Sequence, residues 1–273
     1  INGKHNKLKG WNAAHVYEKP GIYTITLKIT NEGGRSKTVT KSIDIQDNTR
    51  KKIYVSNSGN DNNDGLSESS SVKTLNKAVF LVKDDNEILL KRGEIFDVSS
   101  TLRIPYKNVI IGAYGTGNKP IVRWNGGDDQ FIFSMSGLYT RNLIFENLIF
   151  DSVSSSNIPN GFQPAGTNIA IKDSEFRRLR YAINANNIPN GLLLQDNSAP
   201  LIKSDNGGGL LGYFAWIEGN DIVVLGNKVV YGVPINPYHG AGYHVLRTSG
   251  TTGDFSRLLV ANNDFTNYGR NAI

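Results

Sequence analysis

Five side chains that can carry out acid–base chemistry lie close together near residue 240 of this 273-residue chain. They are Tyr238, His239, Tyr243, His244 and Arg247. β-Elimination beside a carboxylate needs a cation to neutralise the carboxylate, a base to remove the neighbouring proton and an acid to protonate the leaving oxygen. Arg, His and Tyr side chains can fill these three roles. We therefore take this cluster as the candidate catalytic site.

The same cluster also has a structural interpretation. If His244 to Arg247 form a strand with Leu246 pointing inward, His244 points inward as well and belongs to the core. Arg247 then points outward. The sequence leaves both interpretations open.

A second group of basic side chains is a candidate for binding an anionic substrate. It consists of Lys172, Arg177, Arg178 and Arg180. Because charge runs usually lie on solvated surfaces, an exposed turn explains the arginines equally well. Lys172 stands one repeat after Glu146, and we interpret this pair as a surface ion pair that stabilises by about 0–1 kcal/mol.

The sequence predicts no cofactor. Residues 60–65, NDNNDG, match the start of a calcium-binding loop, but Ser71 stands where such a loop requires Glu. We therefore predict an ordered turn and leave open a calcium site with other ligands. Cysteine is absent, which excludes disulfides and cysteine metal sites.

The elements that must position these groups follow from a nine-residue pattern that recurs five times after residue 140. Its second, fourth and ninth places are apolar, and its sixth and seventh are mostly Asn, Asp, Ser or Gly. The copies are NLIFENLIF from Asn142, NIAIKDSEF from Asn168, GLLLQDNSA from Gly191, DIVVLGNKV from Asp221 and RLLVANNDF from Arg257. A strand, a polar turn and a second strand, repeated at about 20–35 residues, predict a solenoid.

Equal places of successive copies lie side by side if the rungs stack about 4.8 Å apart. The polar places then form asparagine ladders, so Asn147, Asp173 and Asn227 are predicted to be structural. The third place should face outward, yet it is apolar in every copy, and an outward apolar strip needs a cover. We expect that cover to come from another domain or protein or from the long insertions at about 151–167, 198–220 and 230–256. Any cleft should then lie on a different sheet.

The segment before the repeats has helical spacing, with apolar residues at Leu75, Ala78, Val79 and Val82. We predict a helix here that caps the first rung, whose interior and backbone would otherwise be exposed.

Residues 1–47 are predicted to be a separate β module, followed by a linker over 48–53. Apolar residues alternate with Thr and Lys from Tyr23 to Ile29, which predicts a half-buried strand. The sequence NEGG at 31–34 supplies a hairpin turn before a returning strand over 38–45.

The net charge of +6 is uneven along the chain, because residues 1–50 hold nine Lys or Arg and only four Asp or Glu. The repeats are therefore close to neutral. They also lack the basic face with interleaved aromatics that a nucleic-acid groove would need, so nucleic acid is not an expected partner. No stretch approaches the length of a membrane-spanning helix.

Two resemblances give these elements a family context. The segment HVYEKPGIYTITLKITNEGG from His15 resembles the second half of a PKD domain, an immunoglobulin-like sandwich. YVSNSGNDNNDGLS from Tyr54, KTLNKAV from Lys73, ILLKRGEIF from Ile88 and GTGNKPIV from Gly115 resemble the entry of right-handed parallel β-helix proteins of the pectate-lyase-like superfamily. The expected fold is therefore all-β: part of a sandwich over 1–47, then a right-handed parallel β-helix with an N-terminal capping helix over 54–273, incomplete at its C-terminal end.

These resemblances imply a function as well as a fold. Members of the superfamily are mainly secreted and act on polysaccharides, so we expect an extracellular or cell-surface protein, part of a longer chain. It would be a polysaccharide lyase or glycoside hydrolase acting on an acidic glycan. The alternative is a non-catalytic adhesin, stalk or binding protein that uses the β-helix as a scaffold. The Gly-His-Gly with clustered aspartates of pectin hydrolases and the Arg-x-Pro-x-x-Arg of pectate lyases are absent, which disfavours those two activities.

Overall fold

The computed structural model describes residues 4–135, 139–153, 159–187, 189–202, 212–230, 244–248 and 256–266. Residues 244–248 are described by their backbone alone. The chain divides into two compact units, one of Ile1–Ala14 with Lys51–Ile273 and the other of His15–Arg50. Residues 4–14, which the sequence grouped with the N-terminal module, thus belong to the unit that contains the repeats.

Within the described residues of the larger unit, the strands form three parallel sheets. Sheet 1 contains β3 (Lys51–Val55), β4 (Asn86–Lys91), β7 (Ile110–Tyr114), β10 (Arg141–Glu146), β13 (Thr167–Lys172), β16 (Asn190–Gln195), β19 (Asn220–Leu225) and β22 (Ser256–Ala261). Sheet 2 contains β5 (Ile95–Val98), β8 (Ile121–Trp124), β11 (Ile149–Ser152), β14 (Glu175–Leu179), β17 (Ser198–Ile202), β20 (Lys228–Val230) and β23 (Asp264–Thr266). Sheet 3 contains β6 (Leu102–Arg103), β9 (Phe131–Ser134), β12 (Asn160–Gln163), β15 (Tyr181–Ala185), β18 (Tyr213–Ile217) and β21 (His244–Thr248).

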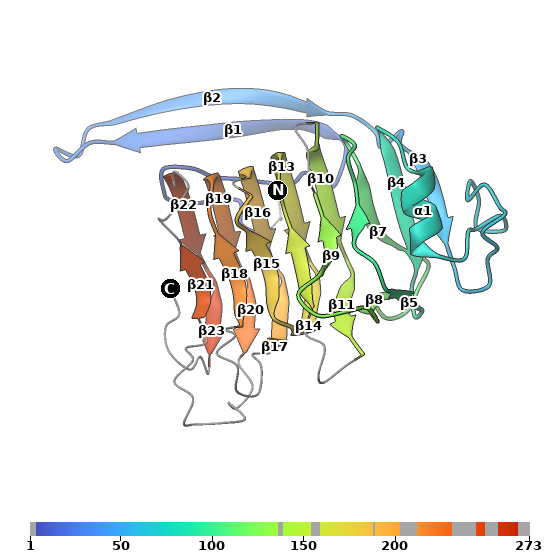
Figure 1. The fold of residues 1–273 in the computed structure, drawn as a ribbon. Helices are drawn as coiled ribbons and strands as arrows, with labels where there is room; N and C mark the ends of the chain where they lie inside the picture. Colours follow the sequence, from blue (N-terminus) through green and yellow to red (C-terminus); the bar gives the residue numbers. More distant parts are fainter. Residues whose placement is uncertain are drawn as a thin grey trace, which may run out of the picture. The chain divides into compact units, whose positions relative to one another are not determined.

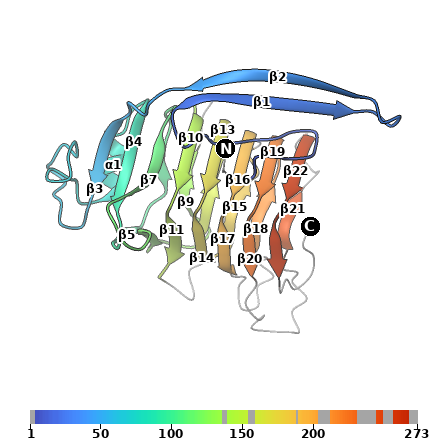
Figure 2. The same ribbon diagram turned by 180° about the vertical axis from the view of Figure 1, so that it is seen from behind.

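From β4 onward the chain visits the three sheets in the same order, and each strand pairs with the strand one turn later (Figures 1 and 2). The result is a parallel β-helix, as the repeat predicted. The nine-residue pattern corresponds to a strand of sheet 1, a corner and the start of a strand of sheet 2. Its right-handed winding stays a prediction.

The core runs along the axis of this solenoid. The second and fourth places of the repeat are buried at Leu143, Phe145, Ile169 and Ile171, and the register pairs each with its equivalent one turn later. A stack of aromatic rings fills the middle turns, with neighbouring centroids 4.7–6.2 Å apart; it consists of Phe133, Phe145, Phe150, Phe162, Phe176 and Phe214. Full burial of each such side chain stabilises the fold by about 1.5–3 kcal/mol.

The seventh place of the repeat forms a buried ladder. The Asn197 amide donates to Asn227 Oδ1 over 3.0 Å, and the Asn227 amide donates to Asn263 Oδ1 over 2.9 Å. Asn227 also donates to the backbone oxygen of Leu194 over 2.8 Å. These bonds satisfy corner groups that the parallel ladder leaves unpaired, and they confirm the structural role predicted for Asn227.

The sixth place has a different structural role, because its backbone adopts positive φ at Asn147, Asp173, Asp196, Gly226 and Asn262. This conformation suits Asn, Asp and Gly far better than other residues. Asn147 and Asp173 are therefore corner residues of the backbone.

The predicted helix is present as α1 (Leu75–Leu81), and its N-cap is Thr74, whose side chain accepts a bond from the Lys77 N–H. Leu75 and Ala78 are buried in the core. In Figures 1 and 2, α1 lies at the β3–β4 end of the solenoid, opposite β22.

The apolar third place is covered by the chain's own N-terminal segment, residues 4–14. The Asn12 amide donates to the backbone oxygens of Ile222 and Arg257 over 3.2 and 2.7 Å, and a Cβ built on Gly10 would lie 2.8 Å from Leu259 Cδ1. The segment thus lies against the strip at β19 and β22, and the third-place residues Ala170, Leu193, Val223 and Leu259 are all buried. The insertions or a partner were expected to cover this strip, whereas these contacts come from a segment distant in sequence.

The smaller unit consists of β1 (Gly21–Thr30) and β2 (Ser36–Ile45), an antiparallel hairpin whose register runs from Gly21↔Ile45 to Thr30↔Ser36. Its turn contains Gly34 at φ 79°. The strand was expected to be half-buried, but Ile25, Leu27 and Ile29 are 45%, 55% and 59% exposed. Two strands alone have no second layer on which to bury a face, and membership of the PKD family stays a prediction.

Among the described residues, no helix has the length and apolar character needed to span a membrane.

Candidate functional site

Two members of the candidate catalytic cluster lie in the third sheet. Tyr238, His239 and Tyr243 fall outside the described residues, whereas His244 and Arg247 belong to β21. The register pairs His244 with Tyr213, Leu246 with Ala215 and Arg247 with Trp216. Tyr213 lies outside the continuous core cluster to which Ala215 belongs. His244 thus has the register position of a residue at the edge of the core.

This register places one residue from every strand of sheet 3 in a single row, which we call the sheet 3 row. Its pairs run from Arg103 through Ser134 and Gln163, and from Asn184 through Trp216 to Arg247. The pairing of Phe162 with Ile183 joins the two halves. The row crosses six strands and is therefore about 24 Å long. Its members are polar or aromatic, while their inward neighbours are apolar.

Hydrogen bonds connect the first part of the sheet 3 row. Arg103 Nη1 lies 3.4 Å from Ser134 Oγ, which donates to Gln163 Oε1 over 3.1 Å. Gln163 Nε2 lies 3.4 Å from Asn186 Oδ1, and the Asn186 backbone N–H donates to Asn184 Oδ1 over 3.3 Å. Arg103 and Asn186 are exposed and Gln163 is half-buried, whereas Ser134 and Asn184 are buried, so solvent reaches only some of these groups.

Aromatic rings gather around the later part of the row. The Tyr181 and Tyr213 rings stack with centroids 5.2 Å apart, and the Trp216 ring lies 6.1 and 6.0 Å from them. The Trp216 indole N–H donates to Glu218 Oε1 over 3.1 Å. Glu218 and both tyrosines are buried, whereas Trp216 is half-buried. Trp216 therefore offers a partly open aromatic surface that its neighbours hold in place.

Arg180 borders this aromatic group. Its guanidinium lies 4.7 Å above the centre of the Tyr181 ring and donates to the Asp129 carboxylate. Two atoms at this edge, Arg180 Nε and Asn160 Oδ1, are buried and have no hydrogen-bond partner in the structure as described. One donor and one acceptor without partners are what a water or a ligand hydroxyl would satisfy.

Arg177 and Arg178 lie in β14 of sheet 2, away from the sheet 3 row. Arg177 forms an ion pair with Glu175, and its hydrogen bond to that carboxylate raises the pKa of the Arg177 guanidinium. Arg178 makes a bidentate pair with Asp151 at 2.7 and 2.5 Å. Both cations would have to leave a carboxylate before they could hold an anionic substrate.

The Arg178–Asp151 pair extends a charged ladder along sheet 2. The register places Asp151 beside Arg123 and Arg123 beside Asp97, and Arg123 donates to both Asp97 oxygens over 2.6 and 2.8 Å. Those hydrogen bonds lower the pKa of the Asp97 carboxyl and raise that of Arg123. Because the charges of these side chains alternate between negative and positive from one turn to the next, the turns stack without like-charge repulsion.

Lys172 lies on the outer side of sheet 1, and the prediction of a surface ion pair is wrong for it. Its side chain is only 2% exposed, and its Nζ lies 3.2 Å from Glu146 Oε2 and 2.7 Å from Asp173 Oδ2. A buried ammonium needs such partners because its desolvation is costly. The four basic candidates thus lie on three different sheets or their edges.

The turn at residues 60–65 is ordered, as predicted. Asp61 accepts from the Lys73 and Thr74 N–H groups and from Thr74 Oγ1, each over 2.8 Å. Asp64 accepts from Leu66 and Ser70. The two carboxylates thus stabilise the loop that leads into α1. Among the described residues no group of three or more His, Asp or Glu side chains could hold a metal, and a calcium site stays a prediction.

Sequence reasoning missed Gln163, Asn184, Trp216 and Glu218. The signal was present in the third strand of successive turns, YAINA from Tyr181, YFAWI from Tyr213 and HVLRT from His244. When these are aligned, the first column reads Tyr, Tyr, His and the fourth reads Asn, Trp, Arg. The nine-residue repeat ends in sheet 2 and therefore does not include these strands.

Comparisons with known proteins give limited context. No protein-family model matches the chain, and no curated protein matches it. Two solved structures of the GH136 lacto-N-biosidase from Eubacterium ramulus are similar. The native protein has 18% identity and a TM-score of 0.46 over 78% of this chain and 40% of its own. The selenomethionine derivative has 15% identity and a TM-score of 0.44 over 79% of this chain and 56% of its own. The chain thus spans about half of those proteins.

Proposed function

We propose that this chain binds an acidic polysaccharide along the outer face of sheet 3 and cleaves it there by elimination or hydrolysis. The observation that carries the proposal is the sheet 3 row, a row of polar and aromatic residues in register over the six described strands. Its repeat of about 4.8 Å is close to the length of one sugar unit in an extended chain. Successive sugars can therefore meet successive side chains.

The residue types in the row suit a hydroxyl-rich ligand. Gln163 and Asn184 in the row, and Asn186 next to it, carry amides that both donate and accept hydrogen bonds. Trp216 supplies an aromatic face for a sugar ring and is kept in orientation by its bond to Glu218. Arg103, at the start of the row, favours a ligand with negative charge.

Elimination would take place at the β18–β21 end, where the residue types suit it. Arg247 beside Trp216 and His244 beside Tyr213 are the kinds of residue that neutralise a uronate carboxylate and remove the adjacent proton. Hydrolysis would instead need two carboxylates across the glycosidic bond. Glu218 is a buried carboxylate beside the row, and it is the candidate for one of them.

The wider proposal comes from the sequence resemblances. The chain would be part of a longer secreted or cell-surface protein, with a right-handed β-helix whose first turn α1 caps. The hairpin of β1 and β2 would be the end of a PKD-like module.

The alternative is a non-catalytic surface protein that uses the solenoid as a scaffold. The observation that favours it is the burial of several members of the sheet 3 face: Tyr213 is 1% exposed, and Ser134 and Asn184 are also buried. A face closed in this way would present fewer groups to a reacting sugar.

Incubation of the protein with a panel of acidic polysaccharides separates these possibilities. Elimination produces an unsaturated, ultraviolet-absorbing chain end, whereas hydrolysis produces new reducing ends without that absorbance. We expect a product with the wild type and none with Arg247→Ala, while Lys228→Ala, on sheet 2, behaves as the wild type. Absence of both products across the panel, together with retained binding, would contradict the enzymatic part and leave the scaffold.

A further inference from the structure

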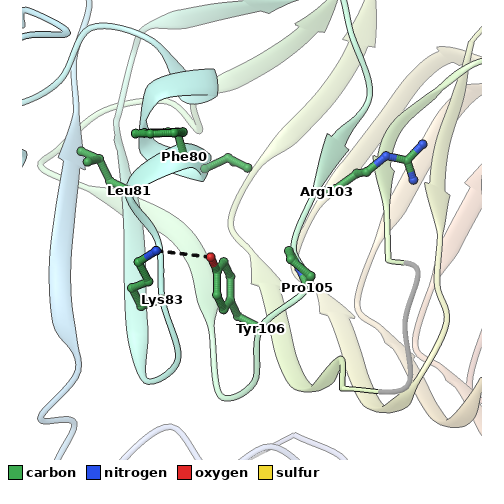
Figure 3. A pocket seen from close by; sticks show the side chains of 7 residues that line it. Phe80, Leu81, Lys83, Arg103, Pro105 and Tyr106 are labelled. Atoms are coloured by element: carbon green, nitrogen blue, oxygen red, sulfur yellow. Dashed lines mark hydrogen bonds between the residues drawn. The ribbon is translucent and has the colours of Figure 1, made fainter.

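The described part of the chain contains a pocket between α1 and the segment that follows β6 (Figure 3). Its volume is about 510 Å³, within the range of about 300–1,000 Å³ that small-molecule sites occupy. Figure 3 shows Phe80 on the helix side, Tyr106 with Lys83 beside it, and Arg103 beyond Pro105.

Two aromatic side chains, Phe80 and Tyr106, line this pocket. Phe80 is 75% exposed, with Lys77 Nζ 5.5 Å from the centre of its ring, so part of the ring is open to a ligand. Tyr106 is half-buried, and its ring lies 5.6 Å below Lys83 Nζ. The pocket therefore has two ring surfaces that a flat apolar face of a ligand can contact.

The pocket is also electropositive. Among the seven described residues that line it, two are cations, Lys83 and Arg103, and none is a carboxylate. The neighbouring Asp84 is engaged with Lys107, whose Nζ lies 3.6 Å from Oδ2 and whose backbone N–H lies 3.0 Å from Oδ1. Lys83 is exposed and lies 3.5 Å from the Tyr106 hydroxyl. A ligand that bears a carboxylate would be attracted here.

The pocket is continuous with the sheet 3 row, because Arg103 belongs to both. It lines the pocket, and its Nη1 is 3.4 Å from Ser134 Oγ, the next member of the row. A glycan that follows the row towards the β6 end therefore arrives at the pocket.

From these observations we infer that the pocket is a terminal subsite for an anionic sugar unit, such as a uronate. One face of the sugar ring packs against Phe80 and Tyr106, its carboxylate is held by Lys83, and Arg103 contacts the junction with the next unit. This inference rests on the proposed function, since it takes the sheet 3 row to be the path of the polysaccharide.

The test uses the acidic polysaccharide that the wild type binds most tightly from a panel of pectate, alginate, hyaluronan and chondroitin. Defined oligosaccharides of that polymer and their carboxyl-reduced, neutral forms are titrated calorimetrically. We expect Lys83→Ala to weaken binding of the acidic oligosaccharide on the order of tenfold and to leave the neutral form unaffected. Phe80→Ala should weaken both forms, and Lys83→Arg should restore the acidic one. Because Phe80 and Lys83 are exposed, these variants should fold, and Lys228→Ala serves as the charge-matched control.

The outcomes separate this subsite from the proposed function. Unchanged binding by Lys83→Ala and Phe80→Ala, with weaker binding by Trp216→Ala, would overturn the subsite while polysaccharide binding along sheet 3 stands. If the wild type binds no polymer of the panel, polysaccharide binding fails and the subsite fails with it.

Discussion

Four basic residues that lie within nine positions of one another have quite different surroundings. Lys172 is buried at sheet 1, Arg177 and Arg178 are paired along sheet 2, and Arg180 borders sheet 3 against Tyr181. A run of positive charge in the sequence therefore does not form a positive patch, because consecutive strands of a β-helix belong to different sheets.

Replacement of Lys172 tests whether this buried cation stabilises the fold. Lys172→Ala leaves Glu146 and Asp173 without their ammonium partner, and we expect a loss of about 1–3 kcal/mol in the free energy of unfolding, since those carboxylates are partly exposed. Polysaccharide binding should not change. Urea unfolding and a binding titration measure the two effects. A stable variant with weakened binding would restore Lys172 as a substrate ligand.

Asp61 gives a pH-dependent prediction. Burial acts to raise the pKa of its carboxyl, but hydrogen bonds from Thr74 and Lys73 outweigh burial and lower that pKa. The unfolded chain therefore binds the proton more tightly, so the stabilisation is present above the ordinary value of about 3.9 and is lost as the pH falls through the lower folded value. Asp61→Asn should cost about 1–3 kcal/mol near neutral pH.

The check is urea unfolding of the wild type and Asp61→Asn between neutral and strongly acidic pH. The gap between the two proteins should narrow below about pH 4. A constant gap over the whole range would show that ionisation of Asp61 does not stabilise the fold.

At the scale of elements, the Asn ladder holds one corner of the solenoid. Asn227 is buried; it accepts from the Asn197 amide and donates to the Leu194 backbone and to the half-buried Asn263. Asn227→Ala leaves several buried groups without partners, and we expect a loss of about 2–4 kcal/mol. Asn76→Ala, on the exposed face of α1, should change stability by less than about 0.5 kcal/mol. Equal midpoints of unfolding for the two variants would argue against the ladder.

The N-terminal segment is a second element with a specific attachment. Asn12→Ala removes the hydrogen bonds to Ile222 and Arg257. The fraction of molecules in which residues 4–14 are detached from sheet 1 should therefore rise by a factor of about five. Trypsin cleavage at Lys7 or Lys9 should accelerate accordingly. Trp11→Ala is the control, because that side chain is 97% exposed. Equal cleavage rates for both variants would mean that Asn12 does not anchor the segment.

The sequence allowed prediction of elements that repeat and not of contacts that occur once. Places two and four of the pattern predicted the inward residues, and the spacing from Leu75 to Val82 predicted α1. The cover of Leu259 by Gly10 joins residues about 250 positions apart, and no local pattern encodes such a contact. The sheet 3 row was missed for a different reason: the nine-residue pattern ends in sheet 2, and the residues of the row vary in type from strand to strand.

At the scale of the molecule, the three faces of the solenoid differ in character. Sheet 1 carries the apolar third place, against which residues 4–14 lie at β19 and β22. Sheet 2 carries the ladder of Asp97, Arg123, Asp151 and Arg178, whose charges compensate one another. Sheet 3 carries the polar and aromatic row with a pocket at its β6 end. A polymer that needs hydrogen bonds and ring contacts along a line therefore has one suitable face among those described.

The most direct test is the affinity for the preferred acidic polysaccharide of two matched variants, one on each of two sheets. Gln163→Ala combined with Trp216→Ala removes an amide and a ring from sheet 3, whereas Lys228→Ala combined with Asp264→Ala removes an ion pair from sheet 2. Circular dichroism confirms that both are folded. We predict at least a roughly tenfold loss of affinity for the sheet 3 variant and none for the sheet 2 variant. Wild-type affinity in the sheet 3 variant would contradict the assignment of this face as the polysaccharide site.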